Sequence, residues 1–274
     1  MNIPNYETLK ITVDGSIARL VLNRPERMNA LSHNMLEELQ KAAGWIDNEV
    51  GIKVVILSGE GEHFCRGADV GGQINANLSQ REMLDLGRKM TDSVANMRPI
   101  VIGKLNGYVI GGGFVLSLAC DIRICADDVM MCLPEAILGW PVPWGCVPRL
   151  VREVGPQVAK EIILACPTLN GNDAFEVGLV RKTVPLKNLD KTVSDLADEI
   201  VKRPAVVIDI IKRSVNEAAD DMAATNRAKN DIDRMMVALK DDEALKATQE
   251  GMVDLVERFG LQNQVPPEGL DLKI

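Results

Sequence analysis

Three consecutive glycines interrupt an apolar run at Ile110-Gly111-Gly112-Gly113-Phe114-Val115-Leu116. The apolar segment before them, residues 99–105, has the pattern of a buried strand, and the segment after them, residues 114–120, has the pattern of a helix. Because glycine has no side chain to cover the backbone, main-chain N–H groups at such a turn are free to stabilise a developing negative charge. The stretch therefore predicts a strand-to-helix junction that presents backbone hydrogen-bond donors.

A lone carboxylate follows about twenty residues later, in Leu133-Pro134-Glu135-Ala136. The segments on either side of it, residues 130–133 and 136–140, are apolar. Apolar surroundings disfavour the ionised carboxylate and raise its pKa towards the value that suits a general base. Glu135 is therefore the candidate proton-transfer residue. The alternative is a glutamate in the first turn of a helix that Pro134 begins.

Length and composition favour one large domain with a smaller appendage. The chain has 274 residues, 46% of them hydrophobic, and a formal net charge of −8 without a Lys/Arg-rich run. This charge argues against a nucleic-acid partner and against an anionic membrane surface. No apolar stretch reaches the roughly 18 to 20 residues that span a bilayer, and the first residues lack a signal-peptide pattern. We expect a cytoplasmic protein with no membrane partner.

Cysteines and histidines give no metal or disulfide pattern. The six cysteines show no C-x-x-C spacing, which predicts reduced thiols. His33 and His63 stand thirty residues apart with no carboxylate pair at ligand spacing, so no metal site is expected. His63 fits a loop histidine, with a phosphate contact as the alternative. Cys65 and Cys146 are candidate nucleophiles, but no histidine stands where it would activate them, which favours core thiols.

Strand and helix patterns alternate through the first part of the chain and give way to helices. The predicted strands are residues 9–13, 17–22, 54–58, 99–105, 121–125 and 129–133. The predicted helices between and after them are residues 32–47 with Ser32 as N-cap, 80–96, 114–120 and 148–165. Residues 59–79 are expected to form a long loop at the edge of the site. Predicted helices also cover residues 189–202, 204–218, 223–240 and 242–259. Strands interleaved with helices imply an α/β fold with helices covering sheet layers.

Four segments resemble the motifs of the crotonase (enoyl-CoA hydratase/isomerase) superfamily in the same order and spacing. They are NRPERMNAL at residues 23–31, GEGEHFCRGADV at 59–70, NGYVIGGG at 106–113 and LPEAILG at 133–139. The resemblance spans about residues 9–259.

This resemblance implies an overall organisation. A crotonase-like spiral of ββα units, residues 1–188, would hold the CoA and acyl site. A helical C-terminal region, residues 189–260, would form trimers and cover the site, and residues 261–274 would be a tail. The ligand would be an acyl-CoA thioester, with no cofactor beyond its CoA moiety. The assembly would be a homotrimer or a dimer of trimers.

The resemblance also assigns the backbone donors. In the family, two N–H groups hold the thioester oxygen as it becomes an enolate, and the motifs place them on Ala68 and Gly112. Loss of one such donor typically lowers the rate about 10²- to 10³-fold. The alternatives are a tight turn at Gly112 and a packing contact at Ala68.

One position departs from the family's hydratases, which carry a second glutamate three residues after the oxyanion glycine. Here that position is Val115, which can neither accept nor donate a proton. The chain therefore resembles the single-glutamate branch, and the leading prediction is an enoyl-CoA double-bond isomerase in which Glu135 moves a proton from C2 to C4. One alternative is a hydratase or hydratase-lyase acting on an atypical, aromatic or cyclic acyl-CoA. Another is a weakly catalytic, trimeric CoA-binding scaffold.

The residues implied to contact CoA lie in two motif segments. They are Arg27, Met28 and Ala30 near the nucleotide half, Ala68, and Asp69 and Val70 beside the adenine. Arg27 is the candidate phosphate ligand and Arg66 a second candidate cation. Trp140 and Trp144 replace a small, glycine-rich loop of the family. They are expected either to line the acyl pocket or to fill the core.

Overall fold

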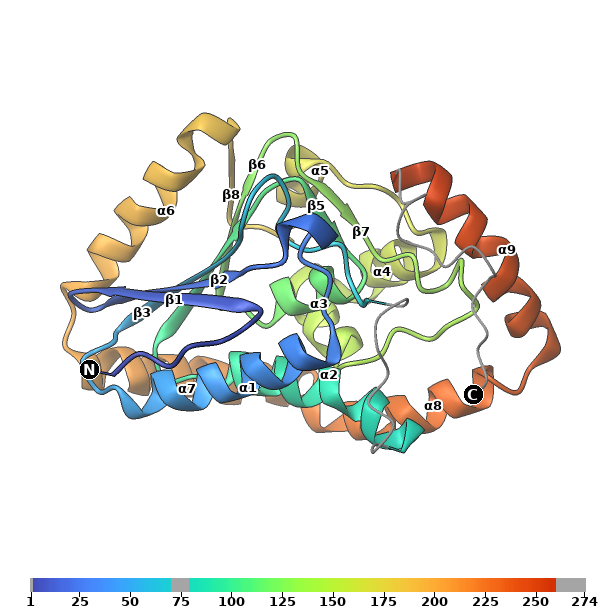
Figure 1. The fold of residues 1–274 in the computed structure, drawn as a ribbon, viewed down its shortest axis with the longest axis horizontal. Coiled ribbons are helices and arrows are strands. Elements are labelled where there is room, and N and C mark those ends of the chain that lie inside the picture. The colour runs from blue at the N-terminus through green and yellow to red at the C-terminus, as the bar shows by residue number, and fades with distance from the viewer. Residues whose placement is uncertain (1, 70–78, 260–274) are drawn as a thin grey trace.

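A six-stranded sheet in the order β1-β2-β3-β4-β6-β8 forms the centre of the molecule (Figure 1). The computed structural model describes residues 2–69 and 79–259, so Val70 and the tail 261–274 lie outside the described residues. The strands are β1 (Leu9–Asp14), β2 (Ile17–Leu22), β3 (Val54–Gly59), β4 (Ile100–Leu105), β6 (Ile122–Ala126) and β8 (Lys182–Val184). The β1–β2 pair is antiparallel and every other pair in this sheet is parallel. Parallel neighbours need crossover connections, which the helices supply.

A second, two-stranded parallel sheet pairs β5 (Tyr108–Ile110) with β7 (Met130–Cys132). The chain runs from β4 through β5 into helix α3 (Gly112–Leu118), and from β6 through β7 towards helix α4 (Cys146–Ala165). Each repeat is a ββα unit whose first strand belongs to the six-stranded sheet and whose second strand belongs to the two-stranded sheet. This arrangement confirms the predicted α/β spiral. Strands β5 and β8 and helix α5 (Gly171–Glu176) were not predicted, because runs of three to six residues carry little periodicity.

Helices cover both faces of the main sheet. Helix α1 (His33–Asn48) and helix α2 (Gln80–Ala95) belong to the larger core on one face, and α6 (Leu186–Val201) lies on the other face (Figure 1). The Ser32 hydroxyl accepts a hydrogen bond from the Met35 amide at 3.2 Å, which confirms the predicted N-cap of α1. Leu189 and Val193 on α6 pack against the outer face of β3 and β4. The α6 helix begins at Leu186, slightly before the predicted 189.

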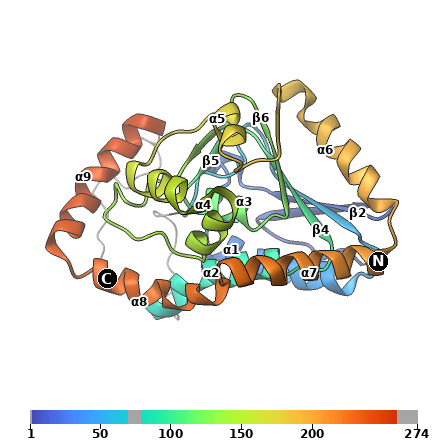
Figure 2. The ribbon, with the colours of Figure 1, turned by 180° about the vertical axis from the view of Figure 1, so that it is seen from behind.

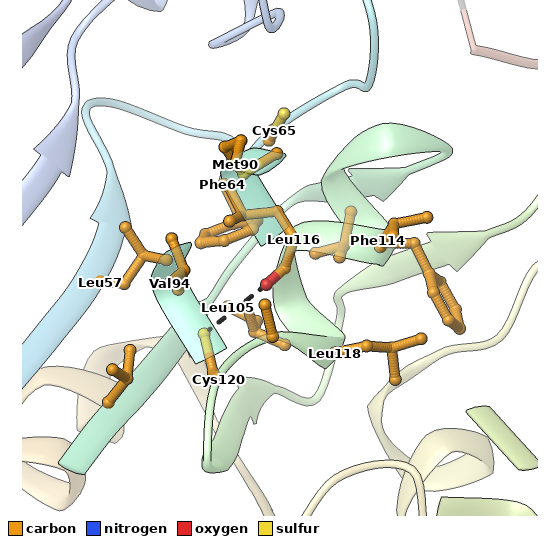
Figure 3. Close-up of a cluster of buried hydrophobic side chains, with 14 of the residues drawn as sticks. Leu57, Phe64, Cys65, Met90, Val94, Leu105, Phe114, Leu116, Leu118 and Cys120 are labelled. Carbon is orange, nitrogen blue, oxygen red and sulfur yellow. Dashed lines mark hydrogen bonds between the residues drawn. The ribbon is translucent and has the colours of Figure 1, made fainter. Parts of the chain in front are cut away.

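A cluster of buried side chains includes residues of helix α3 (Figure 3). Leu57 of β3 and Leu105 of β4 meet Met90 of α2, and Phe114 and Leu116 of α3 complete the group. Because interiors are close-packed, a helix anchored by such side chains has little freedom to shift. The core therefore fixes where the N-terminus of α3 presents its backbone.

The C-terminal part of the chain is helical, as predicted, but one predicted helix is divided. Helix α7 (Ala205–Met222) runs across the back of the molecule, followed by η2 (Thr225–Asn230), α8 (Asp231–Ala238) and α9 (Asp242–Phe259) (Figure 2). The single helix predicted for residues 223–240 is thus wrong, because its first part is a 3₁₀ segment. Lys212 ties α7 to the sheet, donating to the Pro99 carbonyl at 2.9 Å and to Asp121 at 2.8 Å.

Helix α4 also differs from the prediction. It begins at Cys146 and contains a kink at Gly155, whose φ is 75°, immediately before Pro156. Proline removes a helical hydrogen bond and restricts the residue before it, so the kink has a local cause. No helix among the described residues combines the length and apolarity that a bilayer crossing requires.

All six cysteines are free and buried, which confirms the prediction of reduced thiols. Burial raises the pKa of the Cys65 and Cys120 thiols to about 12 and raises that of Cys146 well above its ordinary value. A thiol that stays protonated is a poor nucleophile. The structure therefore supports core thiols over the nucleophile alternative.

Candidate functional site

A pocket of about 240 Å³ brings together residues from five segments of the chain. It is lined by Ala68, Leu84, Gly112, Val115, Glu135, Trp140, Pro143, Trp144, Met235 and Leu239. Most of the lining is apolar, and its polar groups are backbone amides and the Glu135 carboxyl. The segments containing Ala68, Gly112 and Glu135, far apart in sequence, thus meet at one cavity.

The amides of Ala68 and Gly112 lie side by side at this pocket. A Cβ built on Gly112 would lie 3.3 Å from the Ala68 nitrogen. A Cβ built on Gly67 would lie 3.3 Å from the Gly112 nitrogen and 2.8 Å from the Ile110 carbonyl oxygen. Within residues 2–69 and 79–259, neither N–H group has a hydrogen-bond acceptor. Two donors are therefore available to one acceptor in the pocket.

Neighbouring hydrogen bonds hold both peptide groups in place. The Leu31 amide donates to the Gly67 carbonyl at 2.8 Å, and the Asp69 amide donates to the Leu31 carbonyl at 3.1 Å. The Gly111 amide donates to the Cys132 carbonyl of β7 at 2.9 Å. Gly67 and Gly111 have φ values of +104° and +51°, a region that favours glycine. The donors are preorganised by strand-like pairing on each side.

Glu135 lies in a turn after β7 and is 8% exposed. The amides of Leu138 and Trp140 donate to its carbonyl at 3.1 and 2.9 Å and close the turn. Because the residue is in a turn, the alternative of a glutamate in the first turn of a helix is wrong. Burial raises the pKa of its carboxyl to about 7. Its Oε2 is buried without a hydrogen-bond partner among the described residues.

Val115 lines the same pocket and is 1% exposed. Glu135 is the only carboxylate in the lining formed by the described residues. A single group at this site can therefore accept and return a proton near neutral pH. No other described side chain of the lining is a carboxylate that could take the place of the one absent at Val115.

Trp140 and Trp144 both line the pocket, which decides between the two interpretations of these residues. The Trp140 indole nitrogen donates to the Thr248 hydroxyl of α9 at 3.1 Å. The Trp144 carbonyl accepts hydrogen bonds from Thr91 at 2.9 Å and from Arg149 at 3.3 Å. These contacts hold the Trp140 indole and the Trp144 backbone in place. The sequence did not reveal that Met235 of α8 and the following Leu239 add to the lining, because those contacts are long-range.

Three arginines surround Asp69, whose side chain is 1% exposed. Arg24 donates to it at 2.9 Å, Arg27 at 3.1 Å and Arg66 at 3.4 Å. Burial would raise the pKa of Asp69, but hydrogen bonds and charge from Arg24 and Arg27 outweigh burial and lower it. The Asp69 carboxylate thus faces the protein. Arg24 was not among the predicted site residues, because only the fold brings it to Asp69.

The remaining predicted CoA residues differ in accessibility. Arg27 keeps 31% of its side chain exposed, whereas the Arg66 side chain is 5% exposed and its Nε donates to the Arg27 carbonyl at 3.1 Å. Ala30 is fully buried, and Met28 has a left-handed φ of 49° at the end of the short turn Pro25–Arg27. Arg27 is therefore the more accessible of the two candidate cations.

His63 packs within the fold. Its ring stacks on Tyr108 with centroids 4.3 Å apart, and its Nδ1 accepts a hydrogen bond from the Tyr108 amide at 3.2 Å. Burial lowers the pKa of this imidazole. Across the described ranges, no group of three or more His, Cys, Asp or Glu side chains is placed to hold a metal ion.

Comparison with known proteins identifies the class. Residues 12–262 match the model of the enoyl-CoA hydratase/isomerase family, and the chain belongs to this family within the crotonase superfamily. It is 32% identical to a crotonyl-CoA hydratase of Syntrophomonas wolfei, over 92% of this chain and 96% of that protein. It is also 32% identical to a peroxisomal Delta(3,5)-Delta(2,4)-dienoyl-CoA isomerase of Arabidopsis thaliana, over 83% of this chain and 91% of that protein.

Solved structures agree with the fold. An enoyl-CoA hydratase/isomerase from Xanthobacter autotrophicus superposes with a TM-score of 0.80 at 27% identity, covering 95% of this chain and 96% of that one. An enoyl-CoA hydratase from Bacillus anthracis gives a TM-score of 0.74 at 30% identity, covering 89% and 96%. The predicted fold class is thereby confirmed.

Proposed function

We propose that the protein is an enoyl-CoA isomerase that moves a double bond from the 3 to the 2 position of an acyl-CoA thioester. The observation that carries this proposal is the pairing of Glu135 with Val115. Glu135 is the only carboxylate lining the pocket among the described residues, and Val115 stands where the family's two-glutamate hydratases carry their second acid. Double-bond migration needs one group that carries a proton. Water addition in the two-glutamate hydratases needs two carboxylates, which together orient the water.

The thioester oxygen would bind between the Ala68 and Gly112 amides. The two amides are close together and have no acceptor among the described residues, which supports this assignment. Removing a proton from C2 places negative charge on that oxygen, so donors aimed at it stabilise the enolate more than the substrate. The apolar lining excludes water and strengthens the interaction.

Glu135 would then carry the proton. Its ionised carboxylate takes the proton from C2, and the electron pair of the C–H bond enters the enolate. The neutral carboxyl returns the same proton to C4, so the double bond shifts and no water or cofactor is consumed. A pKa of about 7 lets both forms exist near neutral pH, as a group that is base and then acid requires.

The CoA moiety would lie along the segment that holds Arg27 and Asp69. A Thermobifida fusca structure of 26% identity was solved in complex with acetoacetyl-CoA, which supports an acyl-CoA ligand here. All three arginines pair with Asp69, and Arg27 is the most exposed of them, so it is the candidate cation for a phosphate. Met28, Ala30 and Val70 stay predictions as CoA contacts, as does a cytoplasmic location.

The second candidate is a hydratase, because most curated relatives that the chain resembles are named hydratases. A hydratase would need a substrate hydroxyl or another side chain to orient the water that Val115 cannot bind. The third candidate, a CoA-binding scaffold, would bind thioesters without converting them.

The test compares the wild type with Glu135→Gln and with Glu161→Gln, a control on the exposed side of α4. Straight-chain 3-enoyl-CoA is followed to 2-enoyl-CoA, and water addition to 2-enoyl-CoA is followed by mass. The proposal predicts fast isomerisation that falls about 10²- to 10⁴-fold in Glu135→Gln only, with feeble hydration. Fast hydration would establish the hydratase instead, and binding without conversion would establish the scaffold.

We also infer that the protein forms homotrimers through α7, with a dimer of trimers as the larger assembly. Helix α7 exposes a set of apolar side chains, namely Val206, Ile210, Ile211, Val215 and Met222, each at least 56% exposed. A run of exposed apolar side chains along one helix is typical of an interface. Its partner would be a second copy of this chain.

A further inference from the structure

We propose that Trp144 determines which acyl groups the pocket admits, by excluding acyl chains that branch next to the thioester. This inference rests on the proposed acyl-CoA function and specifies its substrate class: straight chains, unbranched at C2 and C3. The residue has no assigned part in proton transfer, and its effect would be on binding and selectivity.

The Trp144 ring lies beside the two backbone donors. The position of a Cβ on Gly112 is 2.5 Å from Cζ3 and 3.1 Å from Cη2 of the indole, and 3.3 Å from the Ala68 nitrogen. The benzo edge of the ring therefore borders the place where a thioester carbonyl would accept from Ala68 and Gly112. The acyl carbons nearest that carbonyl are C2 and C3, so a branch there would meet the indole.

On the face away from Gly112, the Trp144 indole packs against helix α2 and has no room to move. A Cβ on the buried Gly87 of α2 would overlap the indole atoms Cε2, Cδ2 and Nε1, so the ring lies flat on a helix surface that only glycine leaves open. Glycine in a helix is less stable than alanine, so its presence at position 87 is informative. Gly87 and Gly112 together form a slot for this one side chain.

The backbone of Trp144 is held as firmly as its ring. Its φ of 64° is in the left-handed region, which a bulky residue seldom adopts unless its surroundings enforce it. The carbonyl accepts from Thr91 and Arg149, and Arg149 in turn donates to Asp92 at 2.8 Å. The next amide, that of Gly145, donates to Asp231 of α8 at 3.0 Å. A wall fixed at both ends discriminates by shape, because a clash cannot be relieved by moving it.

The test uses two isomeric, saturated thioesters that differ only in branching, butanoyl-CoA and 2-methylpropanoyl-CoA, with direct binding measured by calorimetry. We expect the wild type to bind the straight chain at least about tenfold more tightly, since an extra branched carbon overpacks a filled pocket. Trp144→Ala should reduce this preference to below about threefold. The matched control is Trp45→Ala on α1, a partly buried tryptophan outside the pocket, which should keep the preference.

Three further variants distinguish the proposed role from a folding defect. Trp144→Phe keeps an aromatic core contact and should give an intermediate preference. Gly87→Ala should displace the indole and weaken binding of both thioesters, and Gly87→Ala combined with Trp144→Ala should behave like Trp144→Ala alone.

The outcomes separate the two proposals. A wild-type preference near one, or a preference unchanged in Trp144→Ala and Trp144→Phe, overturns the role of Trp144 while leaving the isomerase proposal intact. If the wild type binds neither thioester and converts no enoyl-CoA, the proposed function fails and this inference fails with it.

Discussion

The carboxylate of Glu135 lies directly against the backbone of Gly111, whose Cβ, if present, would be 2.9 Å from Oε1. Gly111 also has a φ of +51° with a ψ of −119°, a conformation that L side chains rarely adopt. The proposed base and the residue that precedes the proposed oxyanion donor are thus coupled through one contact.

Gly111→Ala should therefore lower kcat about 100-fold, because displacements near 1 Å at a reacting group have effects of this order. The matched control is Gly15→Ala, where φ is +56° but nothing lies within 4 Å of the added Cβ. Steady-state kinetics of both variants provide the measurement. Equal, small effects in the two variants would mean that the Glu135 contact has no catalytic consequence.

Isomerase activity should depend on pH through Glu135. The pKa of this carboxyl is raised to about 7 by burial, and the base must be ionised to take a proton. We expect kcat/KM to rise about tenfold per pH unit below pH 7 and to level off above it. A profile that is flat between pH 5 and 8 would remove Glu135 from the role of base.

Glu135 should also lower stability at high pH. Because its pKa is about 7 when folded and 4.5 ordinarily, the folded protein holds this proton more tightly, and stability is lost as the pH rises from about 4.5 through about 7. Glu135→Gln should therefore be more stable than the wild type by up to about 3 kcal/mol at pH 8. The gain should fade towards pH 5 in urea unfolding. A gain that does not vary with pH would contradict the assignment.

Asp69→Asn should destabilise the loop that presents Ala68. It would leave Arg24, Arg27 and Arg66 close together without their shared carboxylate, and breaking a buried ion pair costs about 3 kcal/mol or more. Asp209→Asn is the control, since its pair with the exposed Arg213 should contribute less than about 1 kcal/mol. Denaturant unfolding compares the two, and similar losses would show that the cluster is not special.

Ile210→Glu should dissociate the assembly proposed for α7, because a charge would replace an apolar side chain that is 57% exposed in the single chain. Val50→Glu, at another exposed apolar position, should leave the mass unchanged. Sedimentation of both variants and the wild type is the measurement. A monomeric wild type would refute the trimer.

The sequence alone predicted the fold class and several features of the site, because these depend on the pattern of nearby residues. The alternation of strand and helix patterns predicted the α/β layers, and Ser32 marked the start of α1. The glycine run predicted a donor turn, and the apolar residues around Glu135 predicted a carboxyl of raised pKa.

Only the tertiary structure decided which of these features meet. Ala68 and Gly112 come together because a bridge at Cys65 and strand β5 join their segments, and Asp69 turns away from the pocket because Arg24 reaches it. Trp144 forms a wall of the pocket because its indole packs against Gly87 of α2, more than fifty residues earlier in the chain. Such pairings follow from chain topology and close packing, which a local pattern does not encode.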